Sequence, residues 1–131
     1  MDDAPSTMMD TAQIRAVESM EERLGTQAWD DAAPFFTDDV RYQVGTRPPV
    51  FGLGGIQSSM QWQSGLVEWR GHDVRAKVNL DDVVIIEVDS KFLRHADGHD
   101  IVIPCTDVYR MQGLRIADWR VYADISAFHG P

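Results

Sequence analysis

Asp107 is an acidic side chain set among apolar neighbours. Alternate residues of an extended segment share one face, and one face of the segment 101–111 consists of Ile101, Ile103, Cys105, Asp107, Tyr109 and Met111. A carboxylate in such surroundings either has a partner or has a raised pKa, and a raised carboxyl pKa suits proton transfer. Asp107 is therefore either a catalytic acid or base, or a structural hydrogen-bonding group.

A second pair of acids, Glu87 and Asp89, shares one face of the segment 83–94. The opposite face is more apolar and consists of Val84, Ile86, Val88, Ser90 and Phe92. Hydrophobicity alone would therefore turn the two carboxylates toward solvent. In a cleft, by contrast, the same pair would titrate unusually and could take part in catalysis.

Two further side chains could orient a substrate oxygen. His72 begins the apolar face of the segment 72–80, where it is either a general acid or base near neutral pH or an ordinary surface histidine. Tyr42 either donates a hydrogen bond into a pocket or packs in the core. Cys105 has no activating base beside it in the sequence, so we expect a buried apolar residue there.

Helices precede strands in the hydrophobic pattern of the chain. Apolar residues at three- and four-residue spacing predict helices over 11–24, 28–36 and 56–69. A period of two then predicts strands, which follow a first strand at 40–45 and lie at 72–80, 83–94, 100–111 and 115–125. This order is typical of an α+β domain in which helices pack on an antiparallel meander.

Three short motifs, in this order of elements, resemble the nuclear transport factor 2-like superfamily. The segment IADWRVYAD (116–124) is similar to the last strand of SnoaL-like polyketide cyclases and limonene epoxide hydrolases. The segment DDVRYQ (38–43) resembles their first strand, and Glu87-Val-Asp89 resembles the Arg-x-Asp motif of the epoxide hydrolases. The resemblance covers residues 10–127 and implies a cone-shaped fold, with N-terminal helices packed on a curved, mostly antiparallel sheet.

The same resemblance implies a site inside the cone. Tyr42, Glu87 and Asp89 would open into the pocket, and the apolar reverse face of the Glu87 strand would serve a homodimer or a sheet-packing contact. The oxyanion-hole aspartate of the related ketosteroid isomerases falls on Asp107. We further expect the substrate pocket to be lined by Trp119, Val121, Val44 and Met60.

The sequence departs from each of these enzyme families at a catalytic position. The Asn and the second Asp of the epoxide hydrolases fall on Val44 and Val121, and their Arg falls on Glu87. The general base of the ketosteroid isomerases falls near Gln43, and their catalytic tyrosine falls near Met20. None of these mechanisms therefore transfers intact.

Composition restricts the classes of binding partner and the cellular location that we expect for the protein. The net charge of −9 disfavours binding to nucleic acid and to anionic membranes. A single cysteine allows neither an internal disulfide nor a cysteine-based zinc site, and we expect no metal or cofactor. The N-terminus has no signal-peptide pattern, so a cytoplasmic protein is expected. Residues 1–10 are expected to be a flexible tail and residues 11–131 a single SnoaL-like domain.

The resulting hypothesis is a cofactor-independent enzyme that uses acid–base chemistry on a small, largely apolar, oxygenated molecule. Cyclisation, isomerisation, dehydration and epoxide opening all suit such a site. Asp89 or Asp107 would carry the proton, and Tyr42 and His72 would orient the substrate oxygen. The alternative is a non-catalytic module of the same fold that binds a small ligand, forms a homodimer, or meets another protein through its sheet face.

Overall fold

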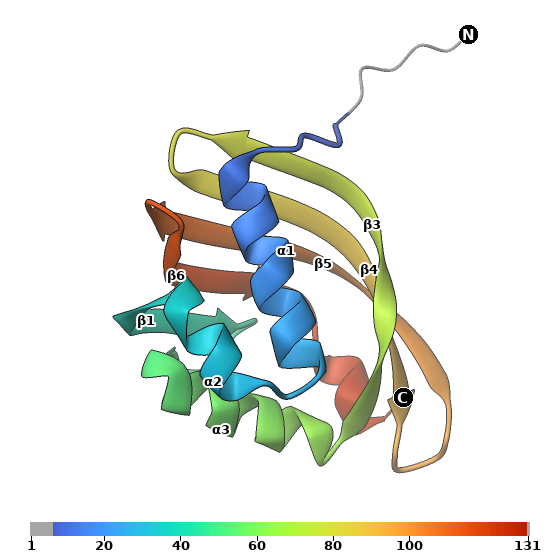
Figure 1. Cartoon of the computed structure of the whole chain (residues 1–131). Coiled ribbons are helices and arrows are strands. Elements are labelled where there is room, and N and C mark those ends of the chain that lie inside the picture. Colours follow the sequence, from blue (N-terminus) through green and yellow to red (C-terminus); the bar gives the residue numbers. More distant parts are fainter. Residues whose placement is uncertain (1–6, 131) are drawn as a thin grey trace, which may run out of the picture.

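The computed structural model describes residues 7–130, in which helices pack on one six-stranded sheet (Figure 1). The helices are α1 (Ala12–Gly25), α2 (Trp29–Ala32) and α3 (Gly52–Ser64), with short 3₁₀ helices η1 (Ala33–Phe35) and η2 (Ser126–His129). The strands are β1 (Phe36–Val44), β2 (Val50–Phe51), β3 (Val67–Leu80), β4 (Val83–Arg94), β5 (Asp100–Gln112) and β6 (Arg115–Tyr122). The predicted α+β class is confirmed.

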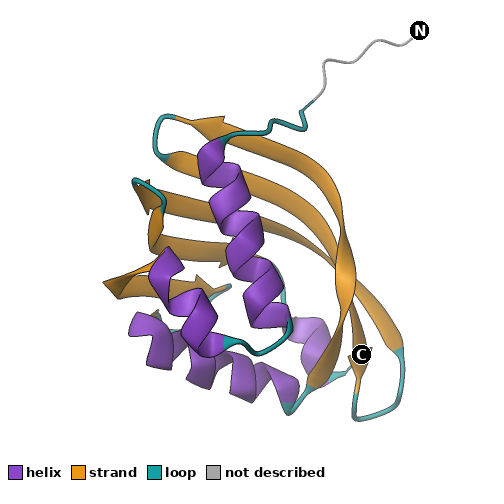
Figure 2. Ribbon diagram, in the orientation of Figure 1, coloured by secondary structure: helices purple, strands orange, loops and turns teal. Residues whose placement is uncertain are grey.

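The sheet is curved and mostly antiparallel, as predicted. Its strand order is β2-β1-β6-β5-β4-β3, and only the β1–β6 pair is parallel. The long strands β3, β4 and β5 bend around the helices, so that α1 lies across the concave face while α3 closes the lower end (Figure 2). Such curvature leaves space between the helices and the inner face of the sheet.

The core joins the apolar side of α1 to the inner face of the sheet. The buried residues of α1 are Ile14, Ala16, Val17, Met20 and Leu24, at helical spacing. On β4 the buried residues alternate and include Val84, Ile86, Val88, Ser90 and Phe92. The apolar face of β4 is therefore the core face, and the expectation that it would be exposed for a dimer or for a partner protein is wrong.

Several predicted boundaries are shifted by glycines and by irregular pairing. Helix α3 ends at Ser64 rather than at Trp69 because Gly65 follows it, and β3 begins at Val67, five positions earlier than the alternation from His72 onward indicates. The β3–β4 pairing shifts register between Trp69 and His72, which interrupts the period of two that a sequence pattern relies on. The predicted second helix is shorter, because Phe36 already belongs to β1.

Part of the expected tail lies along the edge of the sheet. The backbone nitrogen of Met9 donates to the Lys77 carbonyl at 2.8 Å, and the Lys77 nitrogen donates to the Thr7 carbonyl at 2.7 Å. This places residues 7–9 beside β3. The rest of the expected tail, residues 1–6, lies outside the described residues.

Thr11 fixes the start of α1, and its replacement tests how strongly this helix is held. Its hydroxyl oxygen accepts a hydrogen bond from the Ile14 backbone nitrogen at 3.1 Å and the hydroxyl donates to Asn79 Oδ1 at 2.6 Å. We expect Thr11→Ala to lower the free energy of unfolding by about 1 kcal/mol, measured by urea denaturation. Thr46→Ala, in an exposed turn, is the control, and equal losses in the two variants would contradict this role.

Candidate active site

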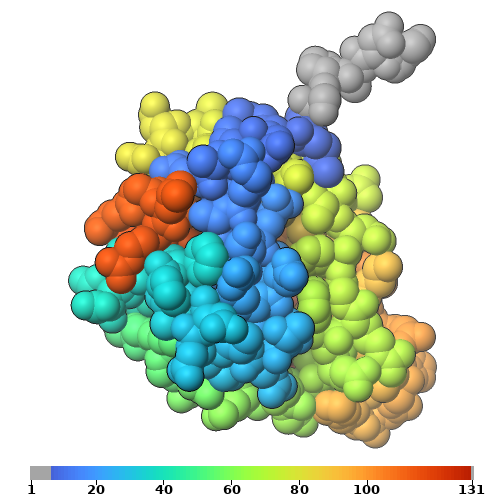
Figure 3. Space-filling view, viewed as in Figure 1, coloured from blue at the N-terminus to red at the C-terminus, as the bar shows by residue number. Residues whose placement is uncertain are grey.

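A cavity of about 530 Å³ lies between α1, α3 and the inner face of the sheet. Its inner wall is formed by buried residues of the sheet, namely Tyr42, Val44, Ile103, Cys105 and Trp119. Exposed residues at the ends of α1 and α3 and at the start of β3 mark its mouth, namely Gly25, Gln27, Ser64, Glu68 and Trp69. Atoms of α1 and β3 meet over the concave face in the space-filling view (Figure 3). The cavity is of the size that small-molecule sites usually have.

Strand pairing places Asp107 in an apolar row across the inner face. Its neighbour on β4 is Ile86 and its neighbour on β6 is Val121, which in turn pairs with Val44 of β1. The adjacent row consists of Val84, Tyr109, Trp119 and Tyr42. The predicted face of β5 is thus the inner face, and Asp107 lines the cavity.

The hydroxyl of Tyr109 joins Asp107 to a second carboxyl group, that of Glu21 on α1. Tyr109 Oη lies 2.5 Å from Glu21 Oε1 and 3.3 Å from Asp107 Oδ2, and the Tyr109 side chain is 0% exposed. A phenol has one proton to donate, and the shorter distance assigns this proton to Glu21. Asp107 completes the second contact when it is itself protonated and donates to the Tyr109 oxygen.

Electrostatics agree with a protonated Asp107. The pKa of Asp107 is raised to about 8, mainly by burial and also by the charge of Glu21, while the contact with the Tyr109 hydroxyl acts in the opposite direction. Burial also raises the pKa of Glu21, against the hydrogen bond from Tyr109 and the neighbouring imidazole of His72, which lower it. Two close carboxyl groups in one dry site cannot both be ionised cheaply, so one of them holds a proton at neutral pH.

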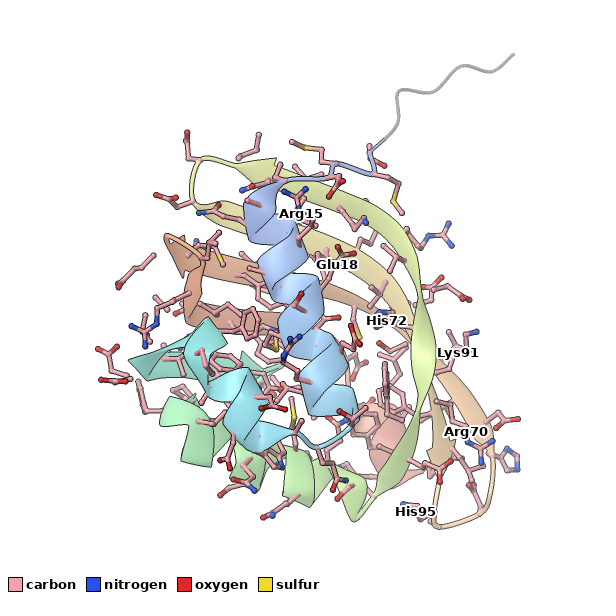
Figure 4. All side chains as sticks on the ribbon, in the orientation of Figure 1. Arg15, Glu18, Arg70, His72, Lys91 and His95 are labelled. Carbon is pink, nitrogen blue, oxygen red and sulfur yellow. The ribbon has the colours of Figure 1, made fainter. Side chains whose placement is uncertain are left out.

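His72 and Tyr42 complete the polar lining near the two acids. His72 Nε2 lies 3.9 Å from Glu21 Oε2, and its ring meets Trp69 edge-on with 5.6 Å between ring centroids; Figure 4 shows His72 between β3 and α1. The Tyr42 ring packs on Trp119 at 4.7 Å. Burial and the nearby Asp107 charge raise the pKa of Tyr42, which keeps its hydroxyl available as a donor.

The structure brings together most of the side chains that the sequence singled out. Tyr42, His72 and Asp107 line the same cavity as the four expected substrate contacts, Trp119, Val121, Val44 and Met60.

Glu87 and Asp89 do not reach the cavity, so their predicted placement is wrong. Glu87 is exposed, and Asp89 pairs with Arg75 at 3.0 Å on the outer face of the sheet. The alternation of β4 explains this, since Val84, Ile86 and Val88 must face the core and the residues between them must face away. Hydrophobic alternation was the correct guide, and the resemblance to an Arg-x-Asp motif was misleading.

Sequence reasoning missed Glu21, although the pattern held a signal. Glu21 follows Ile14 by seven residues and Val17 by four, and it precedes Leu24 by three, so helical geometry places it on the buried face of α1. A carboxylate on that face needs a partner or a proton. Its partner, Tyr109, lies 88 residues away in the chain, and no local pattern connects the two.

Position 121, which pairs with Asp107 in the sheet, holds an apolar residue. An acid there would stand directly beside Asp107, because the two positions pair across β5 and β6. In this chain Val121 fills that position and the second carboxyl group comes from α1 instead.

Metal-binding clusters and membrane-spanning helices are both absent from the described residues. No group of three or more His, Cys, Asp or Glu side chains in residues 7–130 is placed to hold a metal ion. No helix in the same part of the chain is both long and apolar enough to cross a membrane.

No family model and no curated protein matches this sequence, but solved structures do. An NTF2-like protein of unknown function from Burkholderia pseudomallei is 10% identical, with a TM-score of 0.78 over 88% of this chain and 92% of that one. TerC, co-crystallised with polyporic acid, is 14% identical, with a TM-score of 0.79 over 91% and 96%. An LEH-like epoxide hydrolase from M. tuberculosis is 19% identical, with a TM-score of 0.70 over 90% and 86%.

This chain has the nuclear transport factor 2-like fold. A protein with a ketosteroid isomerase-like fold is also among the matching structures, so the fold that the motifs predicted is confirmed. Identities of 10% to 19% establish the shared fold alone. Function must be argued from the residues of the cavity.

Asp107→Asn tests the buried proton through the pH dependence of stability. The folded protein keeps a proton on Asp107 that the unfolded chain releases, so this group makes the free energy of unfolding fall as pH rises from about 4 toward about 8. We expect the variant to lose this decline, gaining up to ~1.4 kcal/mol per pH unit relative to wild type across that window. Urea denaturation at several pH values measures it.

Asp89→Asn is the matched control, because it removes a carboxyl group from the outer face of the same sheet. If both variants changed the pH dependence equally, the contribution would not come from the buried site.

Proposed function

We propose that this protein is a cofactor-independent enzyme that moves protons on a small, largely apolar, oxygenated molecule bound in the cavity. The observation that carries this proposal is the pair of acids, Asp107 and Glu21, joined by the buried hydroxyl of Tyr109 beside the largely apolar inner wall of the cavity. A site built for binding alone gains nothing from two adjacent buried carboxyl groups, which are costly to bury.

The two acids have different roles in this proposal. Asp107, protonated near neutral pH, donates a proton or a hydrogen bond to a carbonyl or epoxide oxygen of the ligand, and the Tyr42 hydroxyl supports the same oxygen. Glu21, which holds the Tyr109 proton by hydrogen bonding, is the carboxylate that accepts a proton from a ligand carbon or from an attacking water. His72 lies on the other side of Glu21 and assists in orienting the ligand.

Such a pair matches the demands of general acid–base catalysis. An acid with a pKa near the working pH donates its proton most efficiently, and the pKa of Asp107 is raised to about 8. The water-poor inner wall, made of Val44, Val121, Trp119 and Ile103, strengthens these interactions. Isomerisation and epoxide opening both consist of a proton delivered to oxygen and a proton removed elsewhere, so they need no cofactor.

Two of the matching solved structures support an oxygenated carbon compound as the ligand. One matching structure was solved with polyporic acid and another is an epoxide hydrolase, and oxygenated carbon skeletons are common to both names. A cavity of about 530 Å³ accommodates a molecule of that kind.

A non-catalytic binding module remains the second candidate because of one specific observation. Val121 and Val44 occupy positions where the epoxide hydrolase pattern has an Asp and an Asn, and both line the cavity. A pocket that has exchanged polar groups for valines favours retention of an apolar ligand over activation of a water molecule. Polyporic acid itself is then a suitable first ligand.

Turnover of a short panel separates the two candidates. An unsaturated ketosteroid is incubated with the protein in D₂O, and deuterium uptake beside its carbonyl group is measured by mass spectrometry. A small cyclic epoxide is tested in parallel for diol formation. We expect turnover of at least one compound, and a loss of ~100-fold or more in Asp107→Asn and in Glu21→Gln, with Asp89→Asn unchanged. Binding of a panel compound without turnover would establish the binding module instead.

A further inference from the structure

A second hollow, of about 430 Å³, lies on the outside of the site between α1 and β3. It is lined by Glu18, Glu22, Thr26, Val74, Lys77 and Ile86, together with four residues that also line the inner cavity. The shared residues are Glu21, Gly25, Trp69 and His72. Glu21 and His72 are the ionisable members of this shared wall, so they reach both the ligand cavity and the outer hollow.

A series of neighbouring polar groups runs from Asp107 to this wall. Asp107 lies 3.3 Å from the Tyr109 hydroxyl, which lies 2.5 Å from Glu21 Oε1. The other oxygen of the same carboxyl group, Oε2, lies 3.9 Å from His72 Nε2. Tyr109 is 0% exposed, whereas the side chains of Glu21 and His72 are 23% and 24% exposed, so the outer members of the series reach the hollow.

The charged groups around Glu21 leave His72 as its neighbour on the outer side. On α1 the nearby acid is Glu18, whose carboxylate is paired with Lys77 of β3 at 3.0 Å. From β5 the groups facing Glu21 are Tyr109 and Asp107. Lys77 is therefore engaged by Glu18, and the imidazole of His72 is the group placed to exchange a proton with Glu21.

We propose that Tyr109, Glu21 and His72 form a proton path that connects Asp107 to solvent in the outer hollow. This inference rests on the proposed function, because it explains how the acid is reset between turnovers. A ligand seated in the cavity separates Asp107 from water at the mouth. A path through the side chains of the wall shared with the outer hollow lets the proton on Asp107 be exchanged while the ligand stays in place.

The transfer is balanced in protons and needs no redox partner. In the release direction the Asp107 O–H bond breaks as the Tyr109 oxygen takes the proton, and Tyr109 gives its own proton to Glu21 Oε1 in the same event. A concerted event is required because burial raises the pKa of Tyr109 well above its ordinary value, so a free phenolate is disfavoured. The reverse sequence recharges Asp107.

The outer half of the path uses the second carboxyl oxygen. A half-turn of the Glu21 carboxyl group presents the new proton to His72 Nε2. His72 then releases the proton on its other ring nitrogen to water in the hollow. The 3.9 Å separation between Glu21 and His72 is spanned either by one water or by a small rotation of the partly exposed imidazole.

Exchange of the Tyr109 hydroxyl proton with water tests this path in the ligand-free protein. NMR saturation transfer from water to that proton measures the rate, which we expect to fall about tenfold or more in His72→Gln. His95→Gln is the matched control, because His95 lines the inner cavity but not the outer hollow. Added imidazole should restore the rate in His72→Ala. A hydroxyl proton signal that is too broad to detect in wild type but visible in His72→Gln would also show slower exchange in the variant, and would support the path.

Equal exchange rates in wild type, His72→Gln and His95→Gln would overturn the path, as would a failure of imidazole to change the rate in His72→Ala. If His72→Gln does not fold, His72→Asn takes its place in the comparison. The readout needs no substrate, so it is separate from the test of the proposed function. If exchange depends on His72 but no panel compound is turned over, the proposed enzymatic function is contradicted and the proton path is supported.

Discussion

The hydrogen bond between the Tyr109 hydroxyl and the Glu21 carboxylate, inside the core, is the constraint on which the site depends. It connects α1 to the middle of the sheet at 2.5 Å and sets one carboxyl group beside another. Burial of both acids is costly, and the shared phenol proton together with a second proton on Asp107 reduces that cost. The position of α1 over the concave face, fixed by its apolar residues and by Thr11 at its start, is thus a condition for the pairing of the two acids.

The curvature of the sheet supplies the rest of the site. Two neighbouring rows on the inner face carry Asp107 and Tyr109 among valines and aromatic rings. The bent strands leave a cavity between α1, α3 and the inner face of the sheet, where a flat sheet would have left close packing. Charged side chains such as Glu87 and Asp89 occupy the outer face. Inside, burial raises the pKa of both Asp107 and Glu21, the charge of Glu21 adds to the rise at Asp107, and Tyr109 and His72 lower the pKa of Glu21.

The sequence was sufficient where the evidence was local and periodic. Strand β4 begins at Val83 and ends at Arg94, as the alternation predicted, and α1 differs by one residue at each end. Asp107 was recognisable as an acid on an apolar face. The start of β3 was missed because its register shifts near Trp69. Glu87 and Asp89 were misplaced because motif likeness was preferred to alternation, and Glu21 was missed because its partner lies 88 residues away.

The central claim is that Asp107 is a neutral acid in the folded protein at neutral pH. Carbon-13 NMR of the side-chain carboxyl groups, with Asp107→Asn to assign the Asp107 resonance, measures this directly as the pH is varied. The account predicts that Asp107 titrates near its raised pKa of about 8. Titration in the ordinary aspartate range of about 4 would show that the buried pair holds no such proton, and the acid–base function proposed for the cavity would lose its basis.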